Sequence, residues 1–242
     1  GDHRDLHSFP KRRSSDLPLF AKNLEGYKNL IKLSSKSFLD IEENSEPHCS
    51  IKDIEENYKG LILLTGSFDG LLGKLFFKNL TDEIIEILKN FKAIFKNNIY
   101  LEIQRHEDEG EKIYENFILN ISTKLELPLI ATHEVFYLDK DMHEAHDALI
   151  CIGNKTYVND KNRKKFTNHH YLKTNNEMSE LFSDIPEALN NNYNFPFRCN
   201  FKPEFSKPVL PNISSEKKGN ADEILTKDSI EGLKDKFLNY LD

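Results

Sequence analysis

Two histidines spaced three positions apart are the first residues in this sequence that suggest metal chemistry. His143 and His146 lie in the run HEAH. A zinc metalloprotease places its two histidines at i and i+4 of one helix, with a glutamate directly after the first histidine, in the pattern HExxH. The i, i+3 spacing here does not form that site. We therefore predict that both histidines lie on a helix surface or in its packing.

The cysteines and glycines favour no other common site. Cys49, Cys151 and Cys199 are odd in number and far apart, which argues against a disulfide framework and a CxxC zinc site and fits a reducing cytoplasm. The run GSFDGLLG at residues 66–73 lacks the Lys-Ser/Thr of a Walker loop and does not match GxGxxG. A phosphate-binding loop is therefore only weakly indicated.

Short apolar runs and longer amphipathic runs alternate along the chain. The apolar runs predict strands over residues 60–65, 99–103 and 128–132. The amphipathic runs predict helices over residues 82–95, 112–125, 142–152, 178–189 (with a turn at 184–186) and 222–241. Strands separated by helices indicate right-handed crossovers and a parallel sheet.

The carboxyl ends of these strands are where side chains are expected to meet. In parallel α/β folds the chemistry lies at that edge of the sheet. The residues there are Gly66–Ser67, Arg105–His106 and His133–Glu134. We expect the three pairs to lie near one another.

Composition limits the classes of partner. The 242 residues carry a net charge of -7, which gives no whole-chain attraction to nucleic acid. The Lys-rich run at residues 154–169 is interpreted as a charged surface loop in which His169 and the adjoining His170 are solvated, with a patch for DNA backbone or a partner subunit as the alternative. No apolar run approaches 18 residues and no secretory signal pattern opens the chain, so we expect a cytoplasmic protein without a membrane partner.

Residues 1–17 differ from the rest of the chain. Residues 7–17 read HSFPKRRSSDL, which resembles the translation of a common sequencing-adaptor oligonucleotide. Three of the six arginines lie in the first 13 residues, whereas the remainder is rich in Lys and Asn. We predict a foreign segment without packed structure; a basic nucleic-acid or targeting patch is the alternative.

Two longer runs carry a family resemblance. Residues 131–152 read ATHEVFYLDKDMHEAHDALICI, residues 171–189 read YLKTNNEMSELFSDIPEAL, and RC follows at 198–199. In this order they resemble the PHP (polymerase and histidinol phosphatase) domain of bacterial replicative DNA polymerase III alpha subunits. The resemblance implies an α/β fold: an incomplete, distorted (β/α)7 barrel with only its later strands, over residues 18–200. A Pro-rich linker and the first helix of the polymerase core would follow, over residues 201–242.

The resemblance also implies a metal site at the barrel mouth. Family members hold divalent metals there with His, Asp, Glu and Cys side chains for phosphoester hydrolysis. The corresponding positions here are Ser67, His106, Glu134 and Phe136. A serine hydroxyl is a poor substitute for a thiolate, and a phenylalanine ring has no lone pair. His106 and Glu134 remain as candidate metal ligands, so we expect a degenerate site with no metal bound and no nuclease activity.

The function that the resemblance implies belongs to a longer protein. Its parent enzyme would extend primers by template-directed deoxynucleotide transfer, using Mg²⁺ held by palm aspartates that these residues do not contain. The implied partners are DNA, deoxynucleotides and other replicase subunits, including a proofreading exonuclease. We expect the PHP part to be structural and to dock that exonuclease. The alternative is an active metal-dependent phosphoesterase or 3′–5′ exonuclease.

Overall fold

The protein is described here from a computed structural model, which describes residues 17–41, 46–163, 165–205, 207–208 and 220–238. The chain forms two compact units, residues 1–201 and residues 202–242, and each is described by itself. The segment predicted to be foreign lies outside the described residues except for Leu17. That prediction therefore stays a prediction.

Four strands form one sheet in the first unit. They are β1 (Leu19–Ala21), β2 (Leu61–Leu64), β3 (Ile99–Ile103) and β4 (Leu129–Ala131), in the order β1-β2-β3-β4. Strands β2, β3 and β4 are parallel, as predicted, and β1 pairs antiparallel to β2. The mixed α/β class is confirmed. Because no pairing joins β4 to β1 within the described residues, closure into a barrel stays a prediction.

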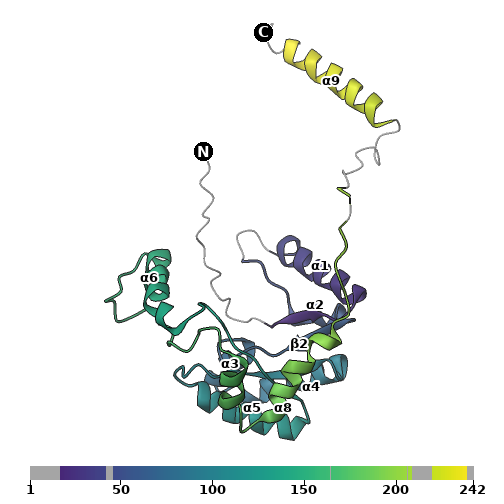
Figure 1. The fold of residues 1–242 in the computed structure, drawn as a ribbon. Helices are drawn as coiled ribbons and strands as arrows, with labels where there is room; N and C mark the ends of the chain where they lie inside the picture. The colour runs from purple at the N-terminus through teal and green to yellow at the C-terminus, as the bar shows by residue number, and fades with distance from the viewer. Residues whose placement is uncertain (1–16, 42–45, 164, 206, 209–219, 239–242) are drawn as a thin grey trace. The chain divides into compact units, whose positions relative to one another are not determined.

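Helices flank the sheet and connect its strands (Figure 1). The helices of the first unit are α1 (Leu24–Leu39), α2 (Ile51–Glu56), α3 (Leu71–Phe77), α4 (Thr81–Phe95), α5 (Glu111–Leu125), α6 (His143–Asn154), α7 (Asn175–Leu181) and α8 (Pro186–Asn194). Two short 3-10 turns are η1 (Lys140–Met142) and η2 (Pro196–Arg198). The single helix predicted over residues 178–189 is two helices, because Pro186 begins α8 at a position where its missing N–H costs nothing.

The apolar core lies between the sheet and helices α4 and α5. Strands β2, β3 and β4 are buried along their whole length. The buried face of α4 is formed by Ile84, Leu88, Phe91 and Phe95, the face that the sequence predicted. Figure 1 shows α4, α5 and α8 gathered together, with α6 standing apart from them.

Helix α8 covers the outer edge of strand β4. The side-chain Nδ2 groups of Asn191 and Asn192 donate hydrogen bonds of 2.7 Å each to the carbonyls of Leu129 and Ala131. An exposed strand edge leaves such carbonyls unpaired. The two asparagines satisfy these two carbonyls without another strand.

Gly73 lies where helix α3 passes close to the preceding turn. A Cβ built at Gly73 would lie 1.7 Å from the backbone oxygen of Phe68. We expect Gly73→Ala to lower the free energy of unfolding by about 1–3 kcal/mol, since backbone must shift to relieve the contact. Urea unfolding measures this loss. The matched control is Gly232→Ala, where the new Cβ would meet no described atom within 4 Å apart from its chain neighbours and the backbone of its own helix; a comparable loss in both variants would contradict the expectation.

The second unit contains helix α9 (Ala221–Leu238). None of its described side chains is buried. Ile230, Leu233 and Phe237, which form the predicted apolar face, are exposed. Residues 202–205 and 207–208 form neither helix nor strand. Within the described residues, no helix is both long and apolar enough to cross a membrane.

Candidate functional site

The carboxyl ends of β2, β3 and β4 are joined by buried polar contacts. The backbone N–H of Glu102 donates to Thr65 Oγ1 at 3.0 Å. Gln104 Nε2 donates to Glu102 Oε1 at 2.8 Å and to Thr132 Oγ1 at 2.9 Å. The Thr132 hydroxyl also donates to Glu102 Oε1. These contacts fix the strand ends from which the candidate site residues project.

Five rings stack in one column beside these strand ends. His106 packs between His133, at a centroid distance of 4.4 Å, and His170, at 4.0 Å and an interplanar angle of 3°. Phe136 stacks on the far side of His170 at 4.9 Å, and His146 stacks on Phe136 at 5.1 Å. We call His133, His106, His170, Phe136 and His146 the histidine column.

Hydrogen bonds assign the protons on the central histidines. A backbone carbonyl only accepts, so the ring nitrogen that faces one must carry the proton. His133 Nε2 lies 3.0 Å from the Tyr171 carbonyl, and His170 Nδ1 lies 3.3 Å from the Glu134 carbonyl. The other nitrogens, His133 Nδ1 and His170 Nε2, are buried and have no hydrogen-bond partner among the described residues.

Both ring nitrogens of His106 have partners. Its Nε2 accepts a hydrogen bond from the backbone N–H of Glu134 at 3.1 Å, and its Nδ1 lies 3.3 Å from Glu111 Oε1. The Glu111 carboxylate also accepts the backbone N–H groups of His106 and Glu107, at 2.7 and 2.9 Å. These contacts fix the ring in place.

Burial shifts two ionisable groups around the column. Burial raises the pKa of Glu111 to about 7, against the lowering effect of its backbone hydrogen bonds. Burial, reinforced by the nearby His106, lowers the pKa of His133 to about 4. His133 is therefore neutral at pH 7, which leaves its Nδ1 as a buried lone pair.

Carboxylates gather around His170 and its neighbour. Asp108 Oδ2 lies 3.4 Å from His170 Nε2, and Glu134 Oε2 lies 4.0 Å from His170 Nδ1. Glu107 Oε2 lies 3.3 Å from His169 Nε2. The column therefore lies in acidic surroundings, which favour a cation.

The four predicted site positions have different surroundings. His106 and Glu134 lie together through the hydrogen bond between them. Phe136 is a member of the column, with its ring between two imidazoles. Ser67 is buried and lines a cavity of about 10 Å³ with Glu102 and other residues, which is room for about one water molecule. Their proposed roles as a vestigial metal site remain predictions.

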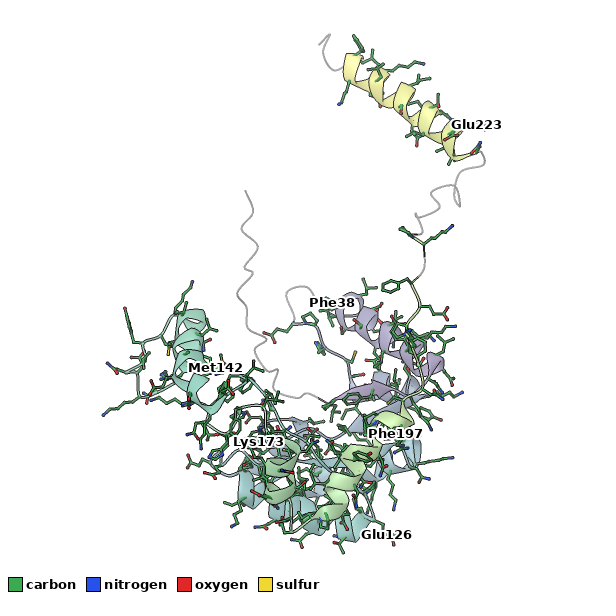
Figure 2. The ribbon with its side chains drawn as sticks, in the orientation of Figure 1. Phe38, Glu126, Met142, Lys173, Phe197 and Glu223 are labelled. Carbon is green, nitrogen blue, oxygen red and sulfur yellow. The ribbon has the colours of Figure 1, made fainter. Side chains whose placement is uncertain are left out.

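His170 was not predicted. The sequence placed it in a solvated loop, and that interpretation is wrong, because His170 is only 1% exposed. Its segment returns to the end of β4, where Tyr171 pairs with Tyr137 and the Phe136 N–H donates to the His170 carbonyl at 2.9 Å. Lys173, labelled in Figure 2, marks this segment three residues further on. No local pattern indicated this long-range pairing.

Asp108 was also missed, although it left a signal. It follows His106 by two positions and the predicted strand 99–103 by five, and imidazole and carboxylate side chains are potential metal ligands. One ligand atom each of His106, Asp108 and His170 lies within 4.8 Å of the others. Their side-chain types are those that hold metal ions, and both ring nitrogens of His106 already contact protein atoms.

Comparison with known proteins connects this geometry to a family. Residues 3–106 match the PHP domain model, and His106 is the last residue matched. The chain carries a PHP domain. Glu134, Phe136 and His170 lie beyond the matched part of this PHP domain.

Proteins named DNA polymerase III subunit alpha are similar to nearly the whole chain. The one from Rickettsia bellii is 35% identical over 219 residues, 90% of this chain. The one from Caulobacter vibrioides is 35% identical over 222 residues, and the one from Borreliella burgdorferi is 36% identical over 231 residues. The PHP-domain chain spans about a fifth of the length of these relatives.

Proposed function

We propose that this chain is the PHP part of a replicative DNA polymerase alpha subunit and that its role there is structural. It would stabilise the polymerase and dock a proofreading exonuclease. Primer extension, with its Mg²⁺, DNA and deoxynucleotides, would belong to the rest of the protein. Similarity over about 90% of the chain to proteins named DNA polymerase III subunit alpha supports the assignment to the replicase.

The position of Phe136 is the observation that supports a structural role. The family resemblance gives this position to a metal-binding histidine. Here the ring of Phe136 stacks between His170 and His146, and it also contacts Phe166 at 4.6 Å. An apolar ring offers no lone pair and disfavours a nearby charge by excluding water. Packing therefore replaces one of the ligands that hydrolysis would use.

Docking is tested by co-elution. The full chain should elute together with the proofreading exonuclease subunit of the same replicase in size-exclusion chromatography at micromolar concentration. Gly73→Ala is the comparison variant. Because it lowers the stability of the fold, it should also weaken a complex that depends on the folded chain. Separate elution of the folded wild-type chain and the exonuclease would overturn the docking role.

A second candidate function is favoured by the residues around His170. His106, Asp108 and His170 converge within 4.8 Å, so the site retains more potential ligands than the sequence indicated. A divalent ion held there would activate water and stabilise charge on a phosphate oxygen. His106, Asp108 and His170 would hold it. This candidate is an active metal-dependent phosphoesterase.

A further inference from the structure

Helix α6 has one packed face and one apolar face that is exposed to solvent. On the packed face Cys151 is buried, His146 stacks on Phe136 at 5.1 Å, and Asp147 forms an ion pair with Arg163. A helix at a protein surface carries polar side chains on the face opposite its packing. The opposite face of α6, together with the residue directly before the helix, instead carries four exposed apolar side chains, which we call the α6 stripe: Met142, Ala145, Leu149 and Ile152.

The α6 stripe has the spacing of a surface that pairs with another helix. Its members are separated by three, four and three positions, which is the a/d pattern through which two helices pack side by side. Ile152 is 75% exposed, and Met142 and Leu149 are 45% and 44% exposed. Figure 1 shows α6 standing apart from the helices that cover the sheet, and Figure 2 labels Met142 at its start. Contiguous exposed apolar side chains of this kind mark an interaction surface.

We propose that the α6 stripe packs against the α6 stripe of a second copy of this chain, in an antiparallel contact with twofold symmetry. The spacing is symmetric about the centre of the stripe. Reversing one helix therefore places Met142 opposite Ile152 of the second copy, and Ala145 opposite Leu149 of the second copy. A small side chain then faces a large one in the two central layers, so that the layers interdigitate. This goes beyond the proposed function, which assigns no self-association to the chain.

The charges beside the stripe favour this occupant and this direction. Residues 139–144 carry three carboxylates and one lysine, whereas residues 152–155 carry Lys155 and no carboxylate. Asp141 and Lys155 are both exposed and lie two heptads apart, so they flank the same side of the stripe. In an antiparallel pair Asp141 of each copy lies beside Lys155 of the other. A parallel pair would instead bring like charges together, which disfavours it.

The contact is small, so the dimer is weak. Two helices of 12 residues that meet along four layers bury less than the area of a standard protein interface. We expect a Kd on the order of 100 µM. Because the same surface is present on both copies, each substitution in the stripe acts twice in the dimer.

Sedimentation equilibrium of the full chain tests the proposal. Over about 5–500 µM protein, we expect a monomer at the lowest concentration and a rising fraction of dimer toward the highest. Leu149→Glu and Ile152→Glu change exposed side chains, so the fold should remain intact, which circular dichroism checks. Each should raise the Kd by more than about 10-fold. The matched control is Ile113→Glu, at an isoleucine of α5 that is 64% exposed, and it should leave the Kd unchanged.

An exchange of charges tests the antiparallel direction. Asp141→Lys alone and Lys155→Glu alone each place like charges side by side in the dimer, and each should raise the Kd. The double variant Asp141→Lys/Lys155→Glu restores opposite charges at both ends of the contact. Its Kd should therefore return toward that of the wild-type chain.

Three results would overturn the proposal. A chain that stays monomeric up to about 500 µM would show that no second copy covers the α6 stripe. A dimer that persists unchanged in folded Ile152→Glu would use another surface. A double variant that dimerises no better than either single variant would exclude the antiparallel contact. These measurements involve neither the exonuclease nor DNA, so their failure and the failure of the proposed function are distinguishable.

Discussion

Arg105→Ala is expected to lower the free energy of unfolding by about 3 kcal/mol. The Arg105 guanidinium donates to both Glu115 oxygens at 2.6 and 2.9 Å and to both Asp184 oxygens at 2.7 and 2.8 Å. It also donates to the Leu181 carbonyl at 2.5 Å and lies 4.8 Å from the centroid of the Phe182 ring. These contacts tie the end of β3 to α5 and to the junction of α7 and α8.

The size of this effect follows from what alanine would leave behind. The Arg105 and Glu115 side chains are only 19% and 13% exposed, so the Glu115 charge would remain in a largely buried place without its partner. The Asp184 side chain is 60% exposed, so water can solvate its carboxylate after Arg105 is removed. The expected loss of stability is therefore at the lower end of the cost of breaking a buried ion pair. Arg105→Lys keeps the charge but loses the bidentate geometry. Its free energy of unfolding should therefore lie between those of the wild-type protein and Arg105→Ala.

Urea unfolding measures the effect of Arg105→Ala. The matched control is Lys52→Ala, which removes an exposed pair with Glu56 at 3.9 Å and should change stability by less than about 0.5 kcal/mol. Equal effects of the two substitutions would show that the Arg105 contacts do not hold these helices in place.

Phe91→Ala is expected to lower the free energy of unfolding by about 3–5 kcal/mol. The Phe91 side chain is fully buried on the inner face of α4, and its ring meets that of Phe95 edge-on at 6.0 Å. Removing the ring loses apolar burial and leaves a cavity that the closely packed sheet and helices only partly fill. The measurement is the denaturant midpoint at unchanged slope.

A phenylalanine at the surface provides the control for Phe91. Phe38, at the end of α1 and labelled in Figure 2, is 64% exposed. Phe38→Ala should change stability by no more than about 0.5 kcal/mol. A small effect of Phe91→Ala, close to that of Phe38→Ala, would contradict the packing described for the core.

Periodicity predicted the elements that bury a regular apolar face. Strands β2, β3 and β4 and helices α4 and α5 repeat apolar side chains along the chain, so their types and approximate bounds could be read from the sequence. Strand β1 and helix α3 were not predicted, and the seven residues of α3 are too few to show a helical period. The break before Pro186 was visible only as a turn, although it separates two helices.

The candidate site was only half visible for a different reason. His106 and Glu134 directly follow predicted strands, so the rule that strand ends meet was enough to place them together. His170 comes from a polar, charged run, and its burial depends on the pairing of Tyr171 with Tyr137, 34 positions earlier. Local composition describes the solvent exposure of a free loop; it contains no information on a segment that returns to the sheet.

A 3′-end hydrolysis assay on primer DNA tests most directly whether the PHP part is structural. The full chain is incubated with Mn²⁺ or with Zn²⁺, and the length of a labelled primer is followed. We expect no metal-dependent shortening, because Phe136 stands where the family resemblance implies a metal-binding histidine, and we expect unchanged results for His106→Ala and for the exposed control His48→Ala. Shortening that requires the metal, disappears in folded His106→Ala and persists in His48→Ala would contradict the structural role and establish a phosphoesterase.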